Sequence, residues 1–236
     1  MTLKGGTVSG LKENRSDPDD PEDDGMIAAD VAAEIVDKGT VLNATNVAFT
    51  GEVGAFEGSK IVINGGSVTA GNCYYDAAHE NRVEKLGTEI SAHDGSEIEL
   101  NKVAVNSNLG AFDGGVITVN DSNVHAANAI YAEGKGSVIN LNSSDGKAKY
   151  KAGFYGLEAN DGGTININGG GNVQGDSNSY CLQINAYKYS TININGNNRK
   201  TYLDAVIYVV DNSQMNINGD IEFSYGVIRV VNGDEN

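Results

Sequence analysis

Tryptophan is absent from this chain of 236 residues, and proline and cysteine occur only twice each. No apolar run approaches about 18 residues, so we expect no helix that spans a bilayer and no membrane insertion by this segment. The N-terminal stretch MTLKGGTVSG also lacks the apolar core of a signal peptide. The two cysteines, Cys73 and Cys181, are far apart in the sequence and leave the redox compartment open.

Basic residues are scarce as well. The chain has 16 Lys and Arg against 32 Asp and Glu, which gives a formal net charge of −16. This charge argues against electrostatic binding to nucleic acid or to an anionic membrane surface. The composition is nevertheless not that of a disordered chain, because 39% of the residues are apolar and they recur periodically.

A short phrase recurs along most of the chain. A corner, usually Gly-Ser or Gly-Gly, is followed by alternating aliphatic residues and then by asparagine. Seven copies occur: GSKIVIN at Gly58, GSEIELN at Gly95, GGVITVN at Gly114, GSVINLN at Gly136, GGTININ at Gly162, YSTININ at Tyr189 and NSQMNIN at Asn212. The first aliphatic position reads Ile61, Ile98, Ile117, Ile139, Ile165, Ile192 and Met215.

A second apolar stretch precedes each corner, with an aliphatic residue and then an alanine two positions later. The alanine position reads Ala55, Ala92, Ala111, Ala132, Ala159 and Ala186, followed by Val209 and Val230. A weaker third stretch contains Val68, Val103 with Val105, Val124, Val173, Leu203 and Ile221 with Phe223. Each unit therefore predicts three short strands with their apolar side chains on one side.

Units of 19 to 27 residues, with one longer gap of 37, place like residues at like positions. Unrelated hairpins do not produce such agreement between whole columns. We therefore predict an all-β fold, a single-stranded right-handed parallel β-helix (β-solenoid) with about nine to ten coils that forms one domain over residues 1–236. Stacked coils would lie about 4.8 Å apart.

The asparagine after each second strand predicts a ladder. Asparagine tolerates left-handed backbone angles, so we expect it to stand at the corner of each coil. Its amide can bond to the equivalent asparagine above and below. The predicted ladder consists of Asn64, Asn101, Asn120, Asn142, Asn168, Asn195 and Asn218.

Three segments depart from the repeat and predict insertions. Residues 12–25 form an acidic loop, residues 72–87 a loop or short helix, and residues 143–153 an outward loop. Within the first loop, Asp20, Glu22 and Asp24 imitate the start of a calcium loop, but its twelfth position is Val31 instead of glutamate. We therefore expect no cofactor, with calcium at these three residues as a weak alternative.

Catalysis by a solenoid requires carboxylates facing outward on neighbouring coils. The outward position between the two inward residues of the first strand contains Tyr131, Glu158, Asn185, Tyr208 and Arg229. Because Glu158 and Arg229 fall three coils apart, they form no pair. This column predicts no catalytic residues and no enzyme. Its aromatic and planar polar groups instead make it a candidate face for binding a sugar or a protein.

Phrases such as GLEANDGGTININGG and NAIYAEGKGSVINLN resemble coils of pectin-lyase-like right-handed β-helices, in particular the passenger domains of bacterial autotransporters. The resemblance covers about residues 38–236 and 1–11. It implies secretion, display at the bacterial outer surface or outside the cell, and commonly adhesion. Neither end of the repeat shows a capping element, so we expect a fragment of a longer chain.

Three functions remain open at this point. The first is a non-catalytic, adhesin-like passenger segment that provides an extended stalk and a binding face. The second is a polysaccharide lyase or glycoside hydrolase, which requires at least two acids within about 10 Å on one face. The third is a calcium-stabilised carbohydrate-binding module. The expected partners are a host-surface glycan or protein, or a second copy joined through uncapped coils.

Overall fold

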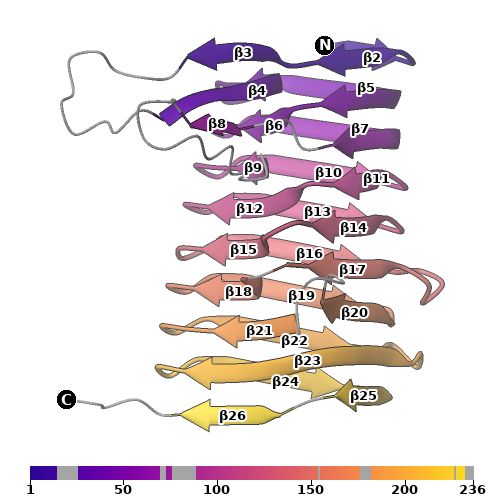
Figure 1. The fold of residues 1–236 in the computed structure, drawn as a ribbon, viewed down its shortest axis with the longest axis vertical. Coiled ribbons are helices and arrows are strands. Elements are labelled where there is room, and N and C mark those ends of the chain that lie inside the picture. The colour runs from indigo at the N-terminus through magenta and orange to yellow at the C-terminus, as the bar shows by residue number, and fades with distance from the viewer. Residues whose placement is uncertain are drawn as a thin grey trace.

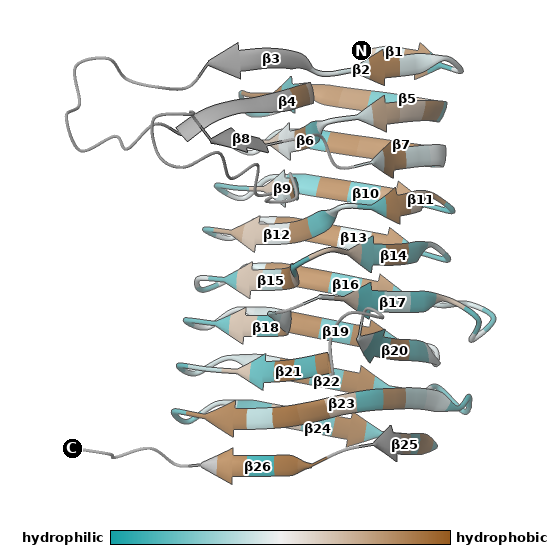
Figure 2. Cartoon of the chain, viewed as in Figure 1, coloured by the Kyte–Doolittle hydropathy of each residue, from teal (hydrophilic) through white to brown (hydrophobic). Residues whose placement is uncertain are grey.

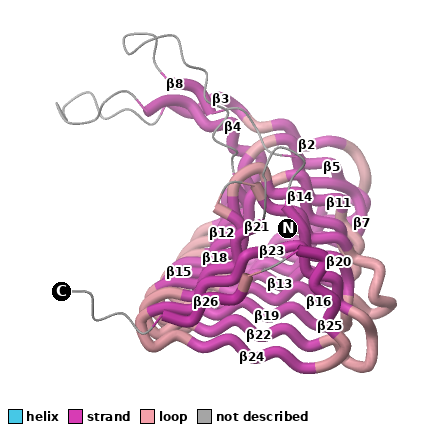
Figure 3. Tube along the Cα trace, turned by 60° about the horizontal axis from the view of Figure 1, so that its bottom comes forward, coloured by secondary structure: helices cyan, strands magenta, loops and turns pink. Residues whose placement is uncertain are grey.

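The computed structural model describes residues 1–14, 26–69, 73–75, 89–153, 155–175, 182–225 and 227–231. Every regular element in these ranges is a β-strand (Figures 1 and 3). No helix long and apolar enough to cross a membrane occurs within them.

Three stacks of strands wind around one core (Figure 1). The first stack contains β4 (Met26–Ile35), β6 (Glu52–Ala55), β9 (Glu89–Ala92), β12 (Asn108–Phe112), β15 (Ala129–Glu133), β18 (Gly156–Asn160), β21 (Leu182–Ala186), the second half of β23 (Thr201–Val210) and β26 (Ile228–Val231). The second contains β1 (Thr2–Lys4), the first halves of β5 (Val41–Thr50) and β7 (Lys60–Thr69), then β10 (Glu97–Asn101), β13 (Val116–Asn120), β16 (Val138–Asn142), β19 (Thr164–Asn168), β22 (Thr191–Asn195) and β24 (Gln214–Asn218).

The third stack completes each coil. It contains β2 (Thr7–Ser9), the second halves of β5 and β7, then β11 (Ala104–Asn106), β14 (Asn123–Ala126), β17 (Lys149–Ala152), β20 (Gly171–Gly175), the first half of β23 and β25 (Ile221–Tyr225). In Figure 1 the strands of the first and third stacks run to the left in front, and those of the second stack run to the right behind, while the chain descends from its N-terminus. A viewer at the N-terminal end would therefore see the chain turn clockwise as it recedes, which is the right-handed winding expected of parallel crossovers.

Strand pairing confirms the predicted β-solenoid. Equivalent strands of successive coils pair in parallel, and the first aliphatic column is in register from Ile61 through Ile98 and Ile117 to Ile192 and Met215. The alanine column pairs in the same way from Ala55 to Ala186. These inward residues are buried, apart from the partly buried Met215, because each coil covers the next, so alternation along a strand becomes one continuous dry core.

About seven regular turns are present, beginning at β6, β9, β12, β15, β18, β21 and the second half of β23. The predicted nine to ten coils were therefore slightly too many. The surplus came from the ends of the chain. The N-terminal coil has a register shift between Val31 and Ala33, and β26 lacks a second and third strand among the described residues.

The N-terminal region adds strands that the repeat did not predict. β3 (Leu11–Asn14) pairs antiparallel with β4, and β4 pairs antiparallel with β8 (Cys73–Tyr75). These strands project away from the coils of the solenoid (Figure 3). Most of the expected insertions at 12–25 and 72–87, together with Asp20, Glu22, Asp24 and Cys181, lies outside the described residues.

One predicted loop was partly wrong. Within residues 143–153, expected to form an outward loop, β17 continues the third stack by pairing with β14 and β20. Tyr150 occupies the inward position between Val124 and Val173 and is 0% exposed. The strand KYKA escaped prediction because its inward residues, Tyr150 and Ala152, each follow a lysine and neither is one of the aliphatic residues that mark the other columns.

The asparagine ladder is present. The side-chain amides of Asn101, Asn120, Asn142 and Asn168 each donate to the oxygen of the preceding member, across 2.8–3.0 Å. Asn195 and Asn218 occupy the same register position. A second ladder, which the sequence analysis did not predict, lies two residues earlier on the same strands. It consists of Thr118, Asn140, Asn166, Asn193 and Asn216.

The backbone at the ladder differs from the prediction. No ladder asparagine has a positive φ angle; the left-handed residue is the next one in several coils, such as Gly65 at 67°, Lys102 at 54° and Asp121 at 49°. Six of the seven asparagines thus end their strands without a left-handed backbone, whereas Asn64 lies inside β7. The bend itself is made one residue later, where glycine costs least.

Candidate functional site

The outer face of the first stack contains the candidate binding column. Register places Tyr131 beside Glu158, Glu158 beside Asn185, and Asn185 beside Tyr208, with Arg229 beside Tyr208 on β26. The structure therefore brings these five residues into one outward row along the solenoid axis. We call the surface formed by the outward side chains of β6, β9, β12, β15, β18, β21 and the second half of β23 the first-stack face.

Three aromatic rings stack at the N-terminal end of this face. The ring centroids of Phe56 and His93 are 4.8 Å apart, those of His93 and Phe112 are 4.7 Å apart, and both pairs are close to parallel. These distances equal the spacing between coils, so the rings lie face to face along the axis. Tyr131 closes the stack at a tilt of 51°, with its centroid 5.8 Å from Phe112.

Glycine makes room for these rings. A Cβ atom added at Gly54 would lie 2.6 Å from the ring of Phe56, and one at Gly110 would lie 2.5 Å from the ring of Phe112. The rings therefore fold back across the strand over positions that have no side chain. Burial among them lowers the pKa of His93, against the opposing effect of Asp94 and Asp113.

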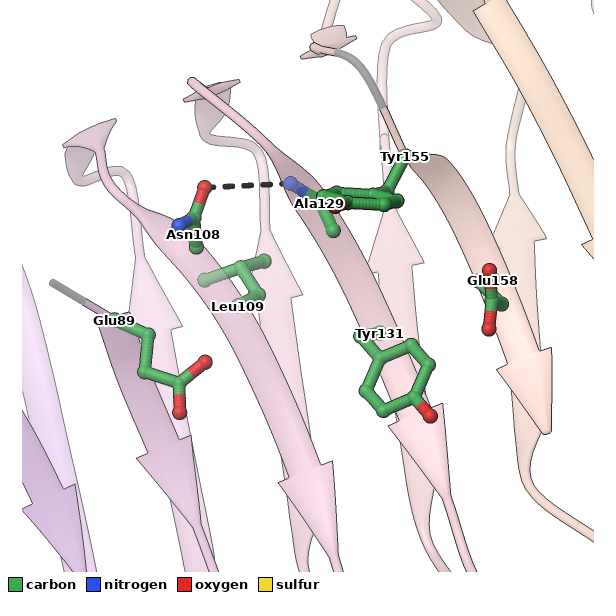
Figure 4. Close-up of a pocket in the computed structure, with 7 residues that line it drawn as sticks. All are labelled: Glu89, Asn108, Leu109, Ala129, Tyr131, Tyr155 and Glu158. Carbon is green, nitrogen blue, oxygen red and sulfur yellow. Dashed lines mark hydrogen bonds between the residues drawn. The ribbon is translucent and has the colours of Figure 1, made fainter. Parts of the chain in front are cut away.

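A pocket of about 240 Å³ opens beside the end of the ring stack. It is lined by Glu89, Asn108, Leu109, Ala129, Tyr131, Tyr155 and Glu158 (Figure 4). Its volume is below the ~300–1,000 Å³ of pockets that enclose a small molecule. This size suits one unit of a longer ligand that lies across the surface.

The strands fix the pocket walls. Figure 4 shows Tyr131 and Glu158 projecting from the neighbouring strands β15 and β18, with Tyr155 beside Ala129. The side-chain oxygen of Asn108 accepts hydrogen bonds from the backbone N–H groups of Asn128 and Ala129, at 2.9 and 3.3 Å. Asn160 donates to the hydroxyl of Tyr131 at 3.2 Å. The polar rim is thus held in place before any ligand arrives.

Glu89 is the most perturbed carboxyl group of the pocket. Burial, reinforced by the nearby charge of Glu52, raises its pKa to about 7. Glu52 occupies the equivalent position on β6, since Val53 pairs with Ile90, and adjacent strands lie about 4.8 Å apart. Burial and then Glu133 also raise the pKa of Glu158, while a hydrogen bond from Asn185 opposes the shift. Two pairs of neighbouring acids therefore lie on this face.

The pocket includes only part of the predicted column. Tyr131 and Glu158 line it, whereas Tyr208 and Arg229 lie farther along the axis. Asn185 is 3% exposed, so it supports Glu158 instead of meeting a ligand. Glu89, Asn108 and Tyr155 were missed because they lie in the neighbouring outward column or in the irregular segment before β18. Glu89 could have been found from its place immediately before the inward Ile90.

Among the residues that the structure describes, no three His, Cys, Asp or Glu side chains come close enough to hold a metal ion. Comparison with protein-family models, curated proteins and solved structures found no match to this chain.

Proposed function

We propose that this chain is a non-catalytic binding segment of a secreted or surface-displayed bacterial protein of the autotransporter-passenger type, and that the pocket of the first-stack face holds one unit of an extended glycan. The observation that carries this proposal is the composition of the pocket, in which Tyr131 and Tyr155 stand beside Asn108 and Glu158. Apolar sugar faces pack on aromatic rings, and sugar hydroxyls bond to planar polar groups. The fixed rim lowers the ordering cost of binding.

The surrounding fold supports a polymer as the ligand. The pocket is open, shallow and set in a face whose outward side chains repeat about every 4.8 Å along the axis. A long molecule can therefore follow the axis and leave one unit in the pocket. The rigid solenoid would serve as the stalk that presents this face.

A glycan array followed by titration calorimetry with the best oligosaccharide tests the proposal. Tyr155→Ala should weaken binding at least tenfold, which corresponds to about 1.4 kcal/mol. Tyr155 is 58% exposed, so its removal should leave the fold intact. Tyr202→Ala, an exposed tyrosine on another face, is the matched control and should bind normally. Equal losses in both variants, or no glycan that binds, would refute the assignment.

A second candidate is a glycoside hydrolase or polysaccharide lyase, favoured by one observation. Glu89 has a pKa of about 7 and neighbours Glu52, as a proton donor beside a second carboxylate would require. Release of reducing ends or of unsaturated products from a polysaccharide panel, lost in Glu89→Gln, would favour this candidate. Binding without any turnover by the intact protein would exclude it for the panel tested.

A further inference from the structure

A second groove, of about 320 Å³, lies on the outside of the third stack. Its outward residues are Ser67 and Thr69 of β7, Ala104 and Asn106 of β11, Asn123 and His125 of β14, and Lys149 and Lys151 of β17, with Val105 and Val124 beneath them. It therefore crosses four coils on a face separate from the pocket described above. Strands β14 and β17 are largely hydrophilic in Figure 2.

The groove gathers cationic groups. Lys149 and Lys151 are two positions apart on one strand, so both side chains point outward, and their Cα atoms lie about 7 Å apart. His125 lies opposite Lys151 in the strand register. The side-chain oxygen of Asn123 accepts a 3.0 Å hydrogen bond from the backbone N–H of Lys149. Two ammonium groups and an imidazole thus share one end of the groove.

No carboxylate lines this groove, although acids outnumber basic residues two to one in the whole chain. Three of the other lysines of the described chain have acidic partners: Lys60 bonds to Glu97, Lys147 to Asp145, and Lys200 to Glu222. Lys149 and Lys151 form no ion pair with any described residue. Their charge is left for something outside the chain.

We propose that this groove binds a tetrahedral oxyanion carried on a sugar, either a sulfate ester or a phosphate ester of a glycan. A lysine ammonium group is a compact point charge with three donors, and it binds phosphate-like oxyanions without the fixed bidentate geometry of arginine. The Thr69 hydroxyl and the Asn106 and Asn123 amides supply neutral partners for sugar hydroxyls. Ala104 keeps the middle of the groove low, so a sugar ring can sit between these ends.

Three saccharides of equal length test this inference in titration calorimetry: a sulfated disaccharide, the same disaccharide phosphorylated, and the unsubstituted parent. We expect a charged form to bind at least tenfold more tightly than the parent, with affinity falling as salt is raised. The tighter of the two charged forms identifies the natural source of the anion. No difference between charged and neutral forms would overturn the inference.

Variants locate the site. Lys149→Gln with Lys151→Gln should lower the affinity for the charged disaccharide at least tenfold, while Lys135→Gln, an exposed lysine at a turn, should not change it. Ala104→Phe keeps the charge but fills the groove, and it should also abolish binding. Circular dichroism confirms the fold of each variant. Full binding by the lysine double variant, or by Ala104→Phe, would place the anion elsewhere and refute the proposal.

Discussion

The side-chain amide of Asn142 donates a 2.9 Å hydrogen bond to the oxygen of Asn120, and its own oxygen accepts a 3.0 Å bond from Asn168. One residue therefore joins three consecutive coils. Such side-chain bonds supplement the backbone bonds between strands and hold the corners of the coils in register.

Asn142→Ala should lower the free energy of unfolding by about 1–3 kcal/mol, because it removes two hydrogen bonds and leaves the Asn120 oxygen and the Asn168 amide without their partner. Asn106→Ala, on an exposed strand position, is the matched control and should change it by less than about 0.5 kcal/mol. Urea unfolding at equilibrium measures both. A loss at Asn142 no larger than at Asn106 would show that the ladder adds nothing to stability.

Removing a polar group at Tyr150 should have the opposite effect on stability. Its hydroxyl is buried in the core and has no hydrogen-bond partner in the described structure, and burial raises its pKa. Tyr150→Phe removes this hydroxyl and should stabilise the protein by about 1 kcal/mol. Tyr150→Ala should cost about 3–5 kcal/mol through the cavity it leaves. A clear destabilisation by phenylalanine in thermal melts would mean that the hydroxyl has a partner in solution, such as buried water.

Gly110 is required by the ring that covers it. Its added Cβ would meet Phe112 at 2.5 Å, so Gly110→Ala should destabilise the protein by about 1–3 kcal/mol. In a Phe112→Ala background the same change should cost less, because the obstructing ring is gone and only the Glu89 carboxylate oxygen, 2.8 Å from the added Cβ, has to shift. A double-mutant cycle measures this coupling. Additive effects would show that the ring does not press on the glycine.

Stability should depend on pH through Glu89, whose pKa rises from the ordinary 4.5 to about 7 on folding. Between these values the folded protein binds more protons than the unfolded chain, so stability falls as pH rises through the window and levels off above it. The loss is at most about 3–4 kcal/mol, since each pKa unit corresponds to about 1.36 kcal/mol. Glu89→Gln should flatten the profile between pH 5 and pH 8. An unchanged profile in Glu89→Gln would assign the dependence to other groups.

The core was predictable from the sequence because a solenoid converts local alternation into columns. Ile61, Ile98 and their equivalents repeat one pattern, and the pattern fixes which coil positions stack. Tyr150 was not predictable in this way, since its strand has no aliphatic inward residue and its outward residues are lysines. The antiparallel pairing of β3 and β4 has no counterpart elsewhere in the repeat, so no column could reveal it.

The candidate site was predictable only in part for a related reason. Column inspection finds outward residues on one line, and it found Tyr131 and Glu158. A pocket is made between lines, and here it also depends on the burial of Glu89 and on Tyr155 in an irregular segment. The strand register gives the positions of such residues along the solenoid. Whether a pocket forms between two columns depends on the side-chain conformations, which the sequence pattern does not give.

Because each regular turn presents the same three strands to its neighbours, every turn adds about 4.8 Å to the length of the solenoid. Excising residues 108–128 would bring Ile90 directly over Ile130 and Asn101 over Asn142, closing the gap with side chains of the same kind. Duplication or loss of a whole turn can thus change the reach of this protein while the remaining turns keep their shape.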